Sequence, residues 1–470
     1  MQLSVLGVVI AAALVLLTAA MSARRAPLLM AAALLVSLCV APVLLTDRAI
    51  DFHVGIAGAK PELRSFTVVV AVLLVALFLQ APSGPRSVDK AHWLLLLWLA
   101  VGTLFFWPQS PLLAAGLVHL VTAVGAGALG LALGRRLCVD VTLVRGLAVV
   151  LGAIVLIQVV VTALQVVGIP VNAMGASEEA LMGLRANGTS NHPNNLGKML
   201  LLLMTFALPL TGSTDATTRR WAVIAVVGAL PPLVLAQGRA NAAAAVLMLL
   251  LWCRFRVRVF SPAARLLLPF TALVMLAASA GVLVQRFIED PRGGVRGEIL
   301  AIAGRLWPEA YVFGLGPNQY TSVVGPTFGS YIPVHNSFVL AAAEMGVVGA
   351  VLLFAPWLKA LVQSWSRRRA EGYDGGAAAA LLASAPGLAL VGMTGWGLLG
   401  TSILPLWFLT TGLLVATRDV VQRRTALGDG DEQHGSPQAD VRTGLLADAP
   451  GLASDSGPGP NATTALRGEN

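Results

Sequence analysis

Charged side chains are scarce in this sequence. Of its 470 residues only 12% are Asp, Glu, Lys or Arg, whereas a soluble globular domain carries about 25%. Hydrophobic residues make up 57%, and the mean hydropathy is +0.79. This balance excludes a soluble globular domain as a description of the whole chain.

Cysteine is scarce as well. The three cysteines, Cys39, Cys138 and Cys253, lie in or beside apolar runs, and their number and spacing suit neither a disulfide framework nor a metal site. We expect them to pack as small hydrophobic residues. The first apolar stretch lacks a preceding basic residue; Arg24 and Arg25 follow it instead. A secretory signal has the opposite polarity, so we expect a retained helix whose N-terminus faces outward.

Apolar runs of about 17–25 residues are abundant, and a helix of this length crosses the hydrocarbon core of a membrane. Backbone polar groups cannot bond to lipid, which leaves helices or closed barrels. The runs are continuous rather than alternating, which favours helices. We therefore predict an all-α, polytopic transmembrane helical bundle of about 12–13 helices. The predicted spans are residues 3–21, 28–46, 66–82, 92–107, 112–134, 141–168, 194–212, 221–236, 239–253, 266–284, 335–362, 376–393 and 399–417.

The net charge of +9 does not indicate a nucleic-acid partner, because the basic residues form short clusters between apolar runs, as the positive-inside rule requires. Neighbouring clusters are two predicted helices apart, so all of them fall on one side, which we assign to the cytoplasmic face of the cell's inner membrane. The clusters are Arg24 with Arg25, Arg86 with Lys90, Arg135 with Arg136, Arg219 with Arg220, Arg254 with Arg256 and Arg258, and Arg367 with Arg368 and Arg369.

The longest loop on the predicted external side is 285–334. Its segment 296–307 has the pattern of an interfacial helix that lies on the outer leaflet and ends at Pro308. The apolar face of that helix would consist of Ile299, Ile302 and Leu306.

Two parts of the chain differ in composition. Residues 1–425 hold all the apolar spans and are expected to form one transmembrane domain. Residues 426–470 are rich in Gly, Ser, Asp and Ala and have no apolar periodicity. We expect them to be a disordered cytoplasmic tail.

Polar residues gather at three places on the predicted external side. RANGTSNHPNNLG at 185–197 leads into a helix, QGRAN at 237–241 forms a tight turn, and VHNSF at 334–338 begins another helix. Each places a cation or an imidazole near the outer boundary, where such a group is costly unless it lines a polar cavity. These segments therefore predict a functional site.

Together with GLGPNQY at 314–320 and HNSFVLAAAEMGVVG from His335, these segments resemble the O-antigen ligase and O-antigen polymerase superfamily of membrane glycosyltransferases. That family shows an Arg-Gly-Thr-like segment before a Pro-Asn helix start, then a Gly-Arg or Ser-Arg turn. A Gly-x-Gly-x-Asn-like element and a His-Asn pair that opens a helix with Glu and Gly follow. The order and sidedness match over roughly 185–350. The chain departs from the pattern in the additional residues between Arg185 and Pro193 and in an extra N-terminal helix.

The resemblance implies a GT-C-like enzyme of polysaccharide biosynthesis. It would transfer a glycan from a polyprenyl-pyrophosphate carrier to a glycan or lipid acceptor on the outer face, with no metal and no cofactor. Arginine binds phosphate oxygens bidentately and stays charged, so Arg185 and Arg239 are candidates for a diphosphate clamp. His335 is suited to position or deprotonate the acceptor hydroxyl, with Asn194 and Asn336 orienting the substrates. No Asp-x-Asp motif lies on the predicted external side, which favours metal-independent transfer.

Several alternatives stay open at the level of sequence. Asn318 and Glu344 are further candidates for substrate binding, but Glu344 is equally suited to a structural ion pair. Arg185 alone could simply cap an external loop, and we expect Lys198 to snorkel to the outer interface rather than to bind phosphate. The motifs do not separate a ligase from a polymerase. The alternative of another class is a lipid-glycan transporter or flippase, which should show internal repeats and midplane charges.

Overall fold

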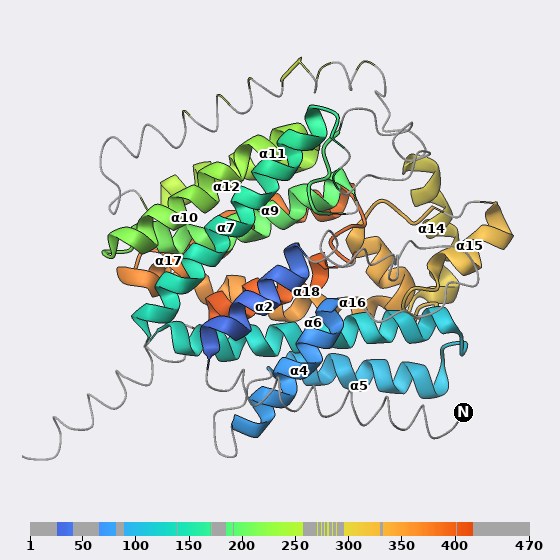
Figure 1. Cartoon of the computed structure of the whole chain (residues 1–470). Helices are drawn as coiled ribbons and strands as arrows, with labels where there is room; N and C mark the ends of the chain where they lie inside the picture. The colour runs from blue at the N-terminus through green and yellow to red at the C-terminus, as the bar shows by residue number, and fades with distance from the viewer. Residues whose placement is uncertain are drawn as a thin grey trace, which may run out of the picture. The chain divides into compact units, whose positions relative to one another are not determined.

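Every regular element in the described part of the chain is a helix (Figure 1). The computed structural model describes residues 26–40, 65–80, 89–138, 140–169, 171, 185–190, 192–256, 296–329, 332–400 and 402–416, with isolated positions between 270 and 288. The helices are α2 (Pro27–Cys39), α4 (Ser65–Gln80), α5 (Lys90–Phe105), α6 (Pro111–Leu137), α7 (Val141–Val166), α9 (Pro193–Ala207), η1 (Leu208–Gly212), α10 (Ala216–Gly228), α11 (Leu230–Leu235), α12 (Arg239–Phe255), α14 (Arg296–Ala310), α15 (Tyr320–Phe328), α16 (Ser337–Arg367), α17 (Gly372–Thr394) and α18 (Ile403–Val415).

Six stretches of helix in the described residues are long and apolar enough to cross a membrane. The chain is therefore a multi-pass membrane protein, and the all-helical prediction is confirmed for this part of it. Each predicted span that falls on described residues coincides with one helix or with two consecutive helices. The spans 3–21 and 266–284 and the tail 426–470 lie outside the continuously described residues. The six stretches are Pro111–Leu137, Val141–Val166, Pro193–Gly212, Ala216–Leu235, Ser337–Arg367 and Gly372–Thr394.

The predicted span 221–236 is divided into two helices, α10 and α11, which meet at Ala229. Pro231 and Pro232 follow the division directly. Proline has no amide hydrogen, and its ring clashes with the carbonyl four residues earlier. The two prolines therefore account for the division of the span.

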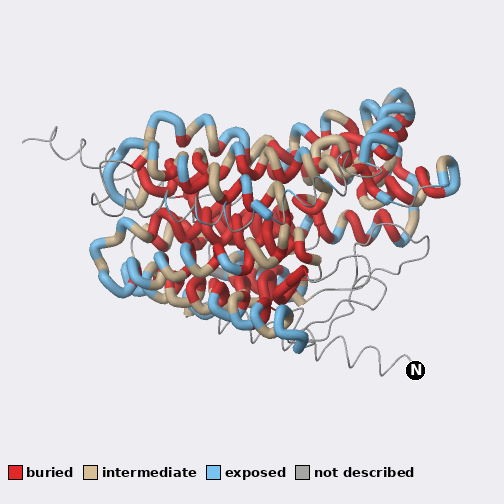
Figure 2. The backbone as a smooth tube through the Cα atoms, turned by 90° about the horizontal axis from the view of Figure 1, so that it is seen from above, coloured by how far each residue is buried: buried red, intermediate tan, exposed pale blue. Residues whose placement is uncertain are grey.

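Small residues allow α6 and α18 to pack with their backbones close together. A Cβ atom added to Gly130 of α6 would lie 2.4 Å from the carbonyl oxygen of Leu409, and one added to Gly412 of α18 would lie 2.5 Å from that of Gly127. In a membrane, close packing of this kind holds helices together, because lipid tails are as apolar as the side chains. Both helices contribute to a continuous buried core (Figure 2).

Gly130→Ala is expected to destabilise the protein, by about 1–3 kcal/mol for an overpacked contact. The methyl group meets backbone that cannot move aside without separating the helices. The measurement is the thermal unfolding midpoint in detergent. The control is Gly304→Ala in α14, where an added Cβ meets no atom within 4 Å. Equal midpoints for wild type and Gly130→Ala would contradict this packing.

The helix ends fall into two groups, as the alternating basic clusters require. At one end of the bundle, Arg145 near the start of α7 forms an ion pair with Asp215 at the start of α10 (2.8 Å). There too, Arg256 after α12 donates to the carbonyl oxygen of Ala370 before α17 (2.6 Å). At the other end, which we call the α9 end, α9, α12 and α16 begin and α2, α7 and α11 finish.

We predict that the α9 end is external. A cysteine placed at Thr327, exposed in α15, should react with a membrane-impermeant maleimide added to intact cells. One placed at Ser366, exposed near the end of α16, should react only after permeabilisation, because the basic clusters mark that end as cytoplasmic. The background carries alanine at the three native cysteines. Labelling in the reverse order would invert the predicted topology.

Helix α14 has the predicted amphipathic pattern, but its apolar face packs on other helices and not on lipid. Ile299, Ile302 and Leu306 are buried together with residues of α15 and α16, so this face packs on protein, and the prediction that it lies on the outer leaflet is wrong for these side chains. The helix also continues to Ala310 instead of ending at Pro308. Only two residues follow this proline, so its missing amide removes a bond in the last turn alone.

Candidate functional site

The segment 185–190 is a loop, yet it is buried among helix ends at the α9 end. Two glutamines of α7 bind its backbone. The Oε1 atom of Gln165 accepts from the amide of Gly188 (2.9 Å), and that of Gln158 accepts from the amide of Thr189 (3.0 Å). Buried amides need partners of this kind, and these bonds fix the path of the loop.

Arg185 connects the start of α9 to the end of α11. Its Nε atom donates to the carbonyl oxygen of Ala236 (3.0 Å), and an Nη atom donates to the Oδ1 atom of Asn194 (2.8 Å). The residue is only 8% exposed. Arg185 thus acts in the described structure as a brace, and Asn194 is its partner.

The turn at 237–241 lies directly beside this brace. Gln237 has a positive φ of 52°, which makes the turn tight, and Arg239 is the half-buried first residue of α12. Asn241 donates to the carbonyl oxygen of Asn194 (3.2 Å). The structure therefore brings the segments that carry Arg185 and Arg239 together.

Lys198 lies one helical turn after Asn194 on α9 and is 5% exposed. Its Nζ atom donates to the Oδ1 atom of Asn195 (3.4 Å) and lies 2.1 Å from where a Cβ on Gly397 would be. The ammonium group points into the protein, so the prediction that it snorkels to the outer interface is wrong. A lysine in the first turns of an apolar helix was the available signal that it belongs to the site.

His335 is half-buried just before α16, and its Nδ1 atom lies 3.1 Å from the carbonyl oxygen of Pro333. Its pKa is lowered from the ordinary value by burial, and the positive charges of Arg296 and Lys198 lower it further, against the hydrogen bond to Pro333. A Nδ1–H group donating to Pro333 leaves Nε2 as the acceptor, the form a general base needs. His335 is thus held neutral among cations.

Asn336 and His192 are used as helix caps. Asn336 accepts from the amides of Phe338 (3.0 Å) and Val339 (3.1 Å) at the start of α16. His192 accepts from the amide of Asn194 (3.0 Å) at the start of α9. Both bonds satisfy amides that have no partner within the helix. The described bonds of Asn336 are therefore those of a helix cap, and its role in substrate binding stays a prediction.

Helix α16 is interrupted at Gly346, whose φ of 70° and ψ of 171° are not helical. The carbonyl oxygens of Ala343 and Glu344 accept from the amides of Leu315 (2.9 Å) and Gly316 (2.8 Å). A Cβ on Gly346 would lie 1.7 Å from the carbonyl oxygen of Val312. The break thus lets the loop before α15 bind the helix directly, and backbone of this kind at membrane depth requires protein around it.

Glu344 and Asn318 meet in this docked loop. The carboxylate of Glu344 accepts from the amides of Asn318 and Tyr320, so its described partners are backbone groups rather than the cation of an ion pair. Asn318, with a φ of 62°, donates its side-chain amide to the carbonyl oxygen of Leu112 (3.2 Å). Both residues line a pocket of about 510 Å³ together with Gly116, His119, Trp396 and Gly400.

The predicted site residues therefore form two neighbouring groups. One contains Arg185, Asn194 and Arg239, with Lys198 leading to His335; the other contains Asn318 and Glu344. The connection between α17 and α18 lies between them. Its Gly395 carbonyl oxygen accepts from the Oγ atom of Ser337 (2.7 Å), and its Gly397 lies against the ammonium group of Lys198. Its Trp396 and Gly400 line the pocket.

Neither the models of known protein families nor the curated proteins give a match to this sequence. Function is therefore inferred from the residues of the site and from the order of the motifs. The site places several cations and a neutral imidazole at one end of a membrane bundle, beside an open pocket. Such a site suits a ligand that carries negative charge at the depth of lipid headgroups.

Proposed function

We propose that this protein is a membrane glycosyltransferase, GT-C-like, that uses a glycan linked to a polyprenyl pyrophosphate. The observation that carries the proposal is that the charges of Lys198 and Arg296 act on His335, while the turn that carries Arg239 adjoins the start of the same helix, α9, on which Lys198 lies. A polyprenyl tail lies in the membrane, so its diphosphate sits at the depth where these helices begin. Preorganised positive charge there stabilises the charge that grows on the leaving pyrophosphate.

The cations have different roles in this proposal. Arg239 and Lys198 contact the diphosphate, Arg239 through its planar fork and Lys198 as a buried point charge. Arg185 holds the start of α9 against the turn that carries Arg239, so it positions the clamp. Asn194 links the two segments: its side-chain oxygen accepts from Arg185, and its backbone carbonyl oxygen accepts from the side-chain amide of Asn241.

His335 acts on the acceptor. Its lowered pKa keeps the imidazole neutral, and a neutral imidazole accepts the proton that the acceptor hydroxyl loses as it attacks the anomeric carbon. The new glycosidic bond forms as the bond to the pyrophosphate oxygen breaks. The pocket that contains Asn318 and Glu344 is proposed to hold sugar hydroxyls, which donate to carboxylate and amide oxygens.

A transporter of lipid-linked glycans is the second candidate. One observation favours it: Leu353 lines the pocket at the α9 end and also a pocket at the opposite end. The site cations nevertheless lie at one end, as a one-sided enzyme requires. A ligase and a polymerase would share this site, and the acceptor alone separates them.

The deciding experiment uses the purified chain in proteoliposomes with a lipid-linked oligosaccharide and a panel of glycan and lipid acceptors. The expected result is a glycosylated acceptor together with free polyprenyl pyrophosphate, lost in His335→Gln. Movement of the intact donor between leaflets without any product would instead establish the transporter. A lipid-linked product of doubled length would identify a polymerase.

Transfer is expected to survive EDTA, because arginine and lysine are proposed to neutralise the diphosphate. The measurement is the initial rate before and after the addition of EDTA at about 5 mM, a concentration on the order of a hundredfold above that of trace divalent metal. Zinc-dependent alkaline phosphatase, assayed in the same buffer, shows that chelation is effective. Loss of transfer on chelation and its return with Mg²⁺ or Mn²⁺ would show that a metal does the work assigned to the cations.

A further inference from the structure

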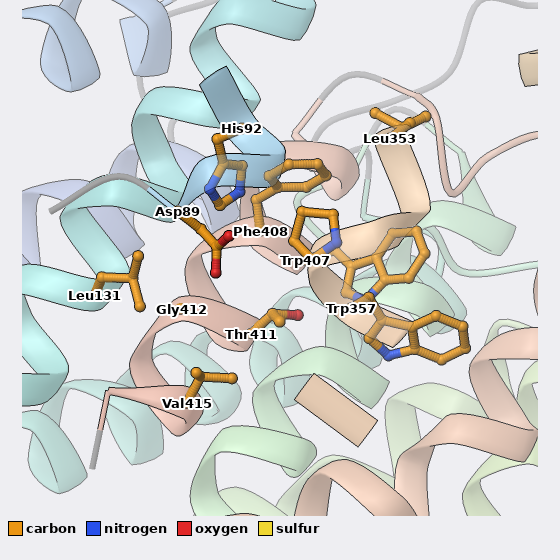
Figure 3. A pocket seen from close by; sticks show the side chains of 11 residues that line it. Asp89, His92, Leu131, Leu353, Trp357, Trp407, Phe408, Thr411, Gly412 and Val415 are labelled. Carbon is orange, nitrogen blue, oxygen red and sulfur yellow. The ribbon is translucent and has the colours of Figure 1, made fainter. Parts of the chain in front are cut away.

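A second pocket of about 450 Å³ lies at the end of the bundle opposite to the candidate site (Figure 3). It is formed by the start of α5, the second half of α16, the last turns of α18 and Leu131 of α6. Apolar side chains make up much of its wall, among them Leu131, Phe408 and Val415. Of the residues that line it, only Leu353 also lines the pocket at the α9 end.

Three buried nitrogen atoms of this pocket have no hydrogen-bond partner among the described residues: Nδ1 of His92 and Nε1 of Trp357 and of Trp407. These residues are 5%, 8% and 3% exposed, and Figure 3 shows their rings gathered around the pocket. An indole N–H group can only donate. Buried polar groups are normally paired, so two unpaired donors facing one pocket indicate a ligand with acceptor oxygens.

The charges at the pocket add to the excess of donors. The carboxylate of Asp89 lines the pocket, but it already accepts from the amide of Ala91 (3.0 Å) and from the ammonium group of Lys359. Lys359 is 49% exposed and has further N–H groups to donate. The hydroxyl of Thr411 and the imidazole of His92 can each donate or accept, so the pocket offers several donors and a single carboxylate that is already engaged.

The outer faces of the two flanking helices show where the ligand's remainder would lie. Trp93 and Leu94 of α5 and Leu358 and Val362 of α16 are exposed apolar residues, as expected for surfaces in contact with lipid. Asp89 and Lys359 lie near helix ends, where headgroups are found. We propose that this pocket binds the phosphate headgroup of a membrane phospholipid, with Trp357, Trp407 and Lys359 donating to its oxygens.

The test follows the indole N–H resonances of the full-length chain by NMR, after removal of lipid in detergent. Three probes are titrated: short-chain phosphatidylglycerol, the matching diacylglycerol, and inorganic phosphate. The phospholipid should shift the resonances of Trp357 and Trp407 and bind at least tenfold more tightly than either other probe, since a hydrogen bond to a charged group contributes about a factor of ten or more. Diacylglycerol binding equally well would overturn the headgroup role.

Phe variants remove one donor while keeping an aromatic ring. Trp357→Phe and Trp407→Phe should each weaken phospholipid binding about tenfold. Trp252→Phe, in α12, is the control, because Trp252 is equally buried at 2% exposure and lies outside the pocket. Equal binding of inorganic phosphate and phospholipid would identify a free anion as the ligand. The absence of any shift in the wild-type protein would overturn the site itself, and that result does not depend on how the variants fold.

Discussion

His335→Gln is expected to lower the transfer rate by about 10²–10⁴, the usual contribution of a general base, while the affinity for the lipid-linked donor changes little. The substitution removes the imidazole, which is proposed to take the acceptor proton. The diphosphate contacts are proposed for other residues, Arg239 and Lys198. Product formation and donor binding are therefore measured separately, the second by retention of a labelled donor in detergent.

His192→Asn is the matched control. His192 caps α9 through its Nδ1 atom, and asparagine is also a favoured cap, so this variant removes an imidazole at the α9 end without removing the cap. It should transfer at nearly the wild-type rate. Equal rates for wild type and His335→Gln would contradict the general-base role.

The same proposal predicts the pH profile. The pKa of His335 is lowered by burial and by Arg296 and Lys198, so the imidazole stays neutral below its ordinary pKa. Activity should persist above the lowered pKa and fall as the pH drops through it. Arg296→Gln removes one of the neighbouring charges, which raises that pKa, and the acid limb should move to higher pH. An unmoved limb would assign it to another group.

The sequence predicts most spans closely because long apolar runs leave few alternatives. The predicted span 141–168 is α7, Val141–Val166, and 194–212 is α9 with η1, Pro193–Gly212. The break of α16 at Gly346 was not predicted. Glycine is common in transmembrane helices, and a positive φ at one of them depends on a loop that binds there.

The candidate site shows a similar division. The sequence predicted that Arg185 and Arg239 belong to one site, because both stand at helix ends on one deduced face, and the segments that carry them do adjoin. The burial of Lys198 was missed, since a long side chain reaches either the interface or the interior, and the choice depends on Gly397, about 200 residues away. Glu344 binds backbone amides of a distant loop, and no spacing in the sequence indicates such partners.

Arg239→Ala is expected to lower the transfer rate by about 10²–10³, the usual cost of losing one preorganised group that stabilises transition-state charge. Arg239 is the first residue of α12 and thus stands at the positive end of the helix dipole, where an anion such as the proposed diphosphate is favoured. Arg239→Lys should also be impaired, because an ammonium group cannot make the bidentate contact. The assay scores transfer together with donor affinity, which should fall in both variants.

Arg220→Ala and Arg220→Lys are the controls for this pair. Arg220 is an exposed arginine of α10 at the end of the bundle opposite to Arg239, so each variant changes the chain's charge as the matching Arg239 variant does, without touching the site. They should transfer at the wild-type rate. If Arg239→Lys matched the wild type while Arg239→Ala failed, a point charge would suffice, and the planar fork would have no part in binding. If Arg239→Ala also matched it, the diphosphate would not lie beside this turn, and the clamp would have to be sought around Lys198 and Arg296.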